Sequence, residues 1–151
     1  MTSEAATAAA ATARAGHGCL RVLIADDNRD AADSLAVSLQ LAGHVTAVAY
    51  DGLKAVELAS GFAPEAAVLD IGMPGLDGYG VARALRDLAA TRGIVLVALT
   101  GRGAANDRAM AIQAGFDRHI VKPGEPDDIQ AVLADVASAR NRWSDSSKIS
   151  K

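Results

Sequence analysis

The stretch LRVLIADDN, residues 20–28, decides the fold class. Five of its first six residues are apolar, which is typical of a strand buried on both faces of a parallel sheet. Two aspartates, Asp26 and Asp27, follow at once. Because ligands of open α/β folds bind beyond the carboxyl ends of the strands, this stretch predicts an acidic group at a binding edge.

Three further apolar runs end in a polar residue in the same way. The runs and the residues that follow them are Ala66–Leu69 with Asp70, Ile94–Leu99 with Thr100, and Phe116–Val121 with Lys122. One such run is ordinary, whereas four in succession predict one site assembled at one edge of a sheet. That site would combine three carboxylates, a hydroxyl and an ammonium group.

The segments between these runs have helical periodicity or turn residues at their ends. Residues 44–50 form one more strand candidate, so residues 19–140 contain five strand–helix units. The predicted helices are Asn28–Leu41, Gly52–Ala59 ended by Gly61, Gly78–Ala90, Arg108–Ala114, and one that starts at Pro126. We expect Asp51 to cap the second of these helices and Asp77 the third. Gly80 weakens the third helix by up to about 1 kcal/mol, and nothing in the sequence explains it.

This alternation predicts an α/β fold with a doubly wound parallel sheet and right-handed crossovers. We expect the flavodoxin-like (βα)5 arrangement with strand order 2-1-3-4-5. The domain would span residues 19–140. Residues 1–18 would form a mobile Ala/Thr-rich arm, and residues 141–151 a polar tail.

Composition narrows the class of protein. The net charge is −3, so we expect no nucleic-acid partner on electrostatic grounds. No stretch is apolar for ~18 residues, so we expect no membrane insertion. The single cysteine, Cys19, fits a reducing compartment and a cytoplasmic location.

The predicted edge has the chemistry of a metal-assisted phosphoryl site. Strands 1 and 3 are neighbours in this order, so Asp26, Asp27 and Asp70 would repel one another unless a cation intervenes. Mg²⁺ is the natural choice because it prefers carboxylate and phosphate oxygens. Asp70, at the central strand, is the best nucleophile, since carboxylates form aspartyl phosphates. Lys122 and Thr100 would bind the phosphoryl oxygens.

Residues 19–140 resemble the receiver domain of two-component response regulators. The resemblance rests on LIADDN at 23–28, LDIGMPGLDGY at 69–79, ALTG at 98–101 and HIVKP at 119–123. The spacings between the acidic pair, Asp70, Thr100 and Lys122 are also those of typical receivers. The chain could be a stand-alone receiver or one excised from a hybrid histidine kinase.

The resemblance implies a role for each site residue. Asp70 would accept the phosphoryl group, and Asp26, Asp27, Asp70 and the Gly72 carbonyl would hold Mg²⁺. Lys122 would bind the phosphoryl group, with Thr100 turning toward it on activation. His119, where many receivers have Tyr or Phe, would be the switch partner of Thr100. The peptide bond before Pro123 would be cis.

The family also implies partners. The donor would be a phosphohistidine on a sensor histidine kinase or a histidine phosphotransfer domain, and the output a downstream protein target. The receiver would catalyse its own modification and would not be a conventional turnover enzyme. Two alternatives are a pseudo-receiver that only binds partners, which should lack the acceptor or the lysine, and a small flavodoxin-like enzyme.

Overall fold

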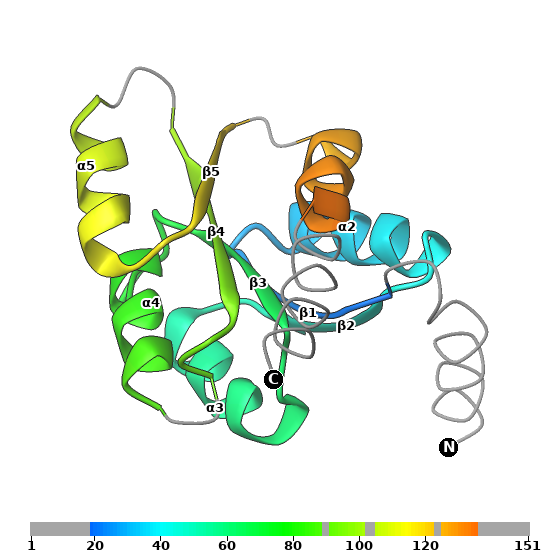
Figure 1. Ribbon diagram of the computed structural model, residues 1–151, viewed down its shortest axis with the longest axis horizontal. Coiled ribbons are helices and arrows are strands. Elements are labelled where there is room, and N and C mark those ends of the chain that lie inside the picture. Colours follow the sequence, from blue (N-terminus) through cyan, green and yellow to red (C-terminus); the bar gives the residue numbers. More distant parts are fainter. Residues whose placement is uncertain (1–18, 89–90, 102–104, 123–124, 136–151) are drawn as a thin grey trace, which may run out of the picture.

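The computed structural model describes residues 19–135, apart from 89–90, 102–104 and 123–124. The predicted arm 1–18, the tail 141–151 and Pro123 lie outside these residues. Figure 1 shows a central sheet with helices on both faces. The sheet is parallel and has the order β2-β1-β3-β4-β5, which confirms the predicted fold class.

The five strands lie where the apolar runs predicted them, with ends that differ by one or two residues. Their bounds are β1 Arg21–Ala25, β2 Val45–Ala49, β3 Ala66–Asp70, β4 Val95–Thr100 and β5 Arg118–Val121. All five residues of β3 are buried, as expected of the central strand. In the register of β1 with β3, Ala25 pairs with Leu69. Asp26 and Asp70 are the next residues along the two strands, so they lie side by side.

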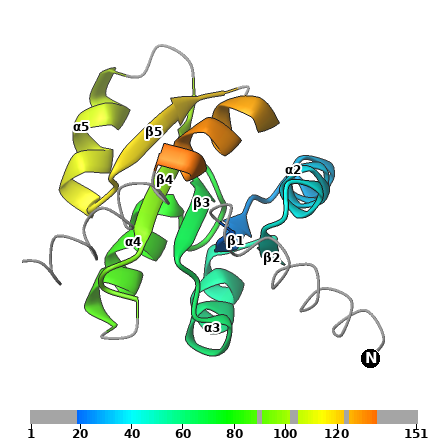
Figure 2. The same cartoon turned by 45° about the vertical axis from the view of Figure 1, so that its right-hand side comes forward.

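The helices form one layer on each face of the sheet (Figure 2). They are α2 Arg29–Leu41, α3 Gly52–Phe62, α4 Gly78–Asp87 and α5 Ala105–Ala114, followed by a helical segment at 126–135. One core lies under α3, α4 and α5, and contains Leu23, Leu69 and Leu96. The other lies under α2 and the last helix, and contains Ile24 and Ile129.

Three helix ends differ from the prediction by three residues, and one of them is the start of α5, which lies at Ala105 and not at Arg108. Helix α3 passes Gly61 and ends at Phe62, and Ala63 adopts the left-handed conformation with φ 53°. The following Pro64 disfavours a right-handed helical conformation at Ala63 and so stops the helix. Helix α4 ends at Asp87, because Leu88 is already extended. The predicted caps Asp51 and Asp77 are confirmed, since each side chain accepts a hydrogen bond from a first-turn N–H.

Candidate phosphoryl and metal site

Asp26 is held in place by the start of α2. It directly follows β1, is 5% exposed, and its N–H donates to the Ala49 carbonyl on β2. Its Oδ1 accepts from the N–H of Asn28 at 3.0 Å, and the Asn28 side chain in turn caps α2 by accepting from the Ala31 N–H. Asp27 is exposed. The residue pair predicted as a unit therefore has one fixed, buried carboxylate and one solvent-facing carboxylate.

Asp70 is the last residue of β3 and is 3% exposed. Its Oδ1 accepts from the Gly72 N–H at 3.2 Å and from the Lys122 ammonium at 2.8 Å. One carboxylate oxygen from each of Asp26, Asp27 and Asp70 lies within 4.8 Å of the others. The structure thus brings together the three carboxylates and the lysine that the strand ends predicted.

Burial and crowding shift the protonation equilibria of this group. Burial is the main cause that raises the pKa of Asp26 to about 6, and the nearby charge of Asp70 adds to it, against the opposing effects of Asn28 and Lys122. Partial burial lowers the pKa of Lys122, but the hydrogen bond and charge of Asp70 outweigh it, so this pKa is raised. The ammonium is held charged beside carboxylates that repel one another.

This donor set fits a hard divalent cation. Carboxylate oxygens are the ligands that Mg²⁺ and similar ions take in proteins. Three carboxylates within 4.8 Å have more negative charge than the Lys122 ammonium balances. A cation among them would favour the ionised form of Asp26, whose pKa burial raises.

Thr100 and His119 lie on the two neighbouring strands β4 and β5. Thr100 ends β4, is 1% exposed, and its carbonyl accepts from the Lys122 N–H at 2.7 Å. His119 is half-buried and pairs with Ala98, two residues before Thr100 in the strand. Residues two apart in a strand face the same side of the sheet. The two predicted switch residues are therefore on one face, next to α5.

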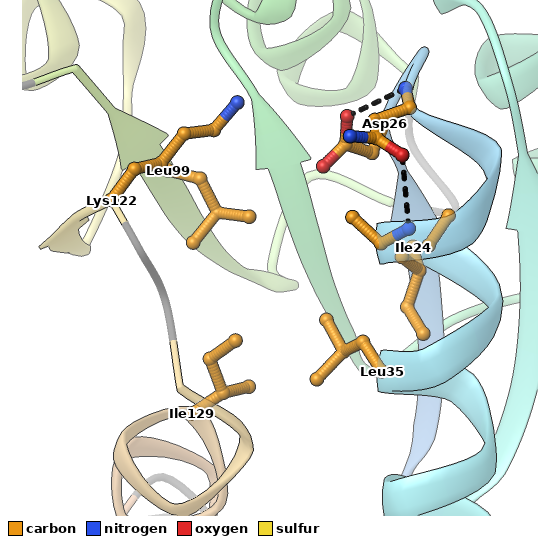
Figure 3. Close-up of a pocket in the computed structure, with 9 residues that line it drawn as sticks. Ile24, Asp26, Leu35, Leu99, Lys122 and Ile129 are labelled. Atoms are coloured by element: carbon orange, nitrogen blue, oxygen red, sulfur yellow. Dashed lines mark hydrogen bonds between the residues drawn. The ribbon is translucent and has the colours of Figure 1, made fainter.

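A cavity of about 420 Å³ opens beside the acidic group (Figure 3). Asp26 and Lys122 lie on opposite sides of its mouth. Its deeper walls are apolar side chains of the core under α2 and the last helix, contributed by β1, β4, α2 and the helical segment 126–135. These wall residues are Ile24, Leu35, Leu99 and Ile129. Low-polarity walls strengthen the electrostatic interactions of the charged groups at the mouth.

Two features were not predicted, one in the site and one at the opposite edge of the sheet. The role of Asn28, which orients Asp26 while capping α2, could have been found from the D-x-N spacing, because a carboxylate often accepts from the N–H two residues on. The second is His44, which the sequence suggests is an ordinary surface residue. It is half-buried, and its Nδ1 accepts from the Leu20 N–H at 3.1 Å.

A family model described as the response regulator receiver domain matches residues 22–134. The chain belongs to the response regulator receiver domain family. The transcriptional regulatory protein PrrA of Mycobacterium tuberculosis is 42% identical over 103 residues, which are 68% of this chain and 43% of PrrA. The response regulator MprA of Mycobacterium avium is 36% identical over 69% of this chain and 45% of MprA. This receiver thus spans less than half the length of the curated relatives.

Solved structures agree with the family. The receiver domain of sensor histidine kinase PA1611 from Pseudomonas aeruginosa, solved with a magnesium ion coordinated in its active site cleft, is 27% identical, with a TM-score of 0.72 over 80% of this chain and 98% of that one. The chemotaxis response regulator CheY4 of Vibrio cholerae is 24% identical, with a TM-score of 0.73 over 78% and 98%. The latter likeness shows the fold alone.

The exclusion of nucleic acid as a partner is wrong. The receiver matches 43% of PrrA, which is named as a transcriptional regulatory protein. The net charge of −3 describes only the residues of this chain, and the remaining length of such a relative carries its own charges.

None of the helices within the described ranges combines the length and apolar character that a membrane span requires.

Proposed function

We propose that this receiver accepts a phosphoryl group on Asp70. The observation that carries the proposal is the 2.8 Å contact between the Lys122 ammonium and Asp70 Oδ1 inside a cluster of three carboxylates. A pseudo-receiver should lack either the acceptor or the lysine, and here both are present and in contact. The acidic cluster after β1 also argues against a flavin phosphate site.

The transfer needs positioning and charge neutralisation rather than a separate base. The Asp70 carboxylate attacks the phosphorus of a phosphohistidine, an O–P bond forms, and the P–N bond breaks. The histidine ring leaves with the bonding electron pair and is protonated by solvent. Lys122 stays charged and pairs with an oxygen of the transferred group. The chain would promote its own modification and would not be a conventional turnover enzyme.

Asp26, Asp27, Asp70 and the Gly72 carbonyl would hold Mg²⁺. When bound, the ion supplies positive charge that offsets the phosphoryl oxygens and the carboxylates. The magnesium ion reported for the PA1611 receiver supports this assignment. The buried carboxylate of Asp26 would bind in one orientation, because Asn28 fixes it.

Switching would follow at β4 and β5. The hydroxyl of Thr100 would turn toward the phosphoryl group, and His119 would move with it on the same face of the sheet. His119 lines a recess with Ile112 of α5 and Phe116, so its movement would change the surface there. A shift between two existing conformations suffices for such a response.

The partners follow from the same chemistry. The donor would be a sensor histidine kinase or a histidine phosphotransfer domain. For the output, the higher identity to PrrA than to the PA1611 receiver favours a transcriptional role over a place in a hybrid kinase. A protein target that reads the altered β4–β5 face would transmit the state of Asp70.

Intact-mass measurement tests the proposal. Incubation with an acyl phosphate and Mg²⁺ should add one phosphoryl group that is labile in base. Asp70→Ala should abolish the addition, whereas Asp87→Asn, at an exposed position in the last turn of α4, should leave it intact. Retention of the group on Asp70→Ala would refute the acceptor assignment. Transfer that survives chelation of Mg²⁺ would remove the metal role of the acidic cluster.

A further inference from the structure

The loop between β3 and α4, residues 71–77, lies beyond the end of the sheet. It carries Gly72, whose N–H donates to Asp70 Oδ1. Its first residue, Ile71, donates to the Leu99 carbonyl and accepts from the Gly78 N–H. These contacts fix the start of the loop and the start of α4, but they leave the middle of the loop to be placed by packing.

Leu76 supplies that packing. It is partly buried and packs against the core under α3 and α4. On one side lies Gly52, the first residue of α3, where an added Cβ would be 2.0 Å from the Leu76 carbonyl oxygen and 3.0 Å from the Leu76 Cβ. On the other side lies Gly80 of α4, where an added Cβ would be 2.3 Å from Leu76 Cδ1. Two glycines on two helices therefore form a notch that admits Leu76.

A third glycine brings α4 against the acceptor strand. A Cβ on Gly78 would be 2.6 Å from the Asp70 carbonyl oxygen and 2.8 Å from Ile71 Cα. By contrast, a Cβ on Gly61, which also lies in α3, would meet nothing within 4 Å. The close approaches thus concentrate on residues 70–76. This also accounts for Gly80, which the sequence left unexplained.

We propose that Gly52 is a positioning residue for the acceptor loop, and that Gly80 leaves room for the end of the Leu76 side chain. By admitting the Leu76 backbone beside α3, Gly52 sets the place of Gly72 relative to the Asp70 carboxylate. The inference rests on the proposed function, which gives the loop position its chemical consequence. A side chain at Gly52 would displace the backbone at Leu76 and carry Gly72 with it, whereas a side chain at Gly80 would displace only the flexible end of Leu76.

The comparison of Gly52→Ala with Gly61→Ala in the same helix tests this. Helix propensity favours alanine at both positions, so a purely local effect would have the same sign in both. We expect Gly52→Ala to move the Gly72 amide resonance in the metal-free protein, weaken Mg²⁺ binding, and slow Asp70 phosphorylation roughly tenfold, since misplacement of about 1 Å can reduce a rate ~100-fold. Gly61→Ala should match the wild type in all three.

A double-mutant cycle with Leu76 covers the case in which Gly52→Ala does not fold. Gly80→Ala should destabilise the wild-type protein but stabilise the Leu76→Ala variant, because the clashing atoms are then gone and only helix propensity remains. An unshifted Gly72 amide in Gly52→Ala, or equal effects of Gly80→Ala in both backgrounds, would overturn the inference. If the Gly72 amide shifts in Gly52→Ala but the wild-type protein is not phosphorylated either, the proposed function is rejected and the positioning role stands.

Discussion

Charged side chains are arranged differently at the amino edge of the sheet, where the strands begin, and at its carboxyl edge, where they end. At the amino edge, the Arg86 guanidinium donates to the carbonyls of Arg92, Ile94 and Gly115 and to the carboxylate of Asp117. At the carboxyl edge, three carboxylates crowd within 4.8 Å, and Asp70 is paired with the single ammonium of Lys122. At the amino edge the charges of Arg86 and Asp117 have fixed partners, whereas the acidic cluster at the carboxyl edge keeps an excess of negative charge.

This difference separates stability from function. A partly buried charge stabilises a fold only when hydrogen bonds surround it. Crowded like charges destabilise the metal-free fold, but they prepare a site for a cation and a phosphoryl group. Substitutions at the two edges should therefore change the free energy of unfolding in opposite directions.

The largest effect is expected at the amino edge. Arg86→Met keeps an unbranched apolar stem but leaves the carbonyls of Ile94 and Gly115 without this donor. It also leaves Asp117, which in addition accepts from the Leu96 N–H, without its cation. Because Arg86 is 24% exposed, we expect a loss of about 3 kcal/mol in the free energy of unfolding, measured with denaturant.

Arg83→Met is the matched control for this prediction. Arg83 is exposed in the same helix, so its substitution should change stability by less than about 0.5 kcal/mol. An Arg86→Met variant as stable as Arg83→Met would show that the guanidinium contacts contribute nothing, and the contrast between the two edges would fail.

A smaller effect of opposite sign is expected at the carboxyl edge. Asp26→Asn keeps the acceptor for the Asn28 N–H but removes one of the crowded charges. In the absence of Mg²⁺ the variant should be about 1–2 kcal/mol more stable than the wild type. Raising a carboxyl pKa from 3.8 to about 6 corresponds to a destabilisation of the ionised form by at most ~3 kcal/mol. Solvent at the carboxyl edge screens part of this.

Mg²⁺ should make the wild type more stable than Asp26→Asn. Binding to the folded state alone stabilises the wild type in proportion to the logarithm of ion concentration, and thermal melts should show no such rise for Asp26→Asn. Asp27→Asn gives the comparison, because its exposed carboxylate should add less to metal-free stability while still contributing to the ion's effect. A destabilised Asp26→Asn in metal-free buffer would contradict the crowding argument.

The carboxyl edge could be predicted from sequence for a simple reason. Parallel strands bring their carboxyl ends to one edge, so Asp26, Asp70, Thr100 and Lys122 needed only correct strand ends and strand order to be placed together. Short, regular elements give strong periodic patterns, and local turn chemistry predicted the caps Asp51 and Asp77.

The contacts that depend on packing could not be predicted in this way. Arg86 reaches Gly115, 29 residues further along the chain, and an arginine in the last turn of a helix suggests only a favourable interaction with the helix dipole. Leu76 lies in a loop rich in turn residues, where no periodicity distinguishes a buried side chain from an exposed one. The Arg86 contact follows from the packing of α4 beside α5, and the burial of Leu76 from the packing of α3 against α4, so neither follows from one helix alone.

The smallest expected effect is the pH dependence that His44 gives to the amino edge. Burial lowers the pKa of His44 in the fold, and its Nδ1 must be unprotonated to accept from the Leu20 N–H. The unfolded chain therefore binds the proton more readily, and stability is present above the unfolded value near 6.5 and lost as pH falls through the folded value. Asp26 acts with the opposite sign in metal-free protein, since its raised pKa means that stability falls as pH rises toward and through 6.

The effect of His44 is thus best measured by denaturant unfolding in the Asp26→Asn background, where stability should decline below pH 6.5. Adding His44→Asn, whose amide oxygen can still accept from the Leu20 N–H, should flatten this decline. An unchanged decline in the double variant would assign it to other groups.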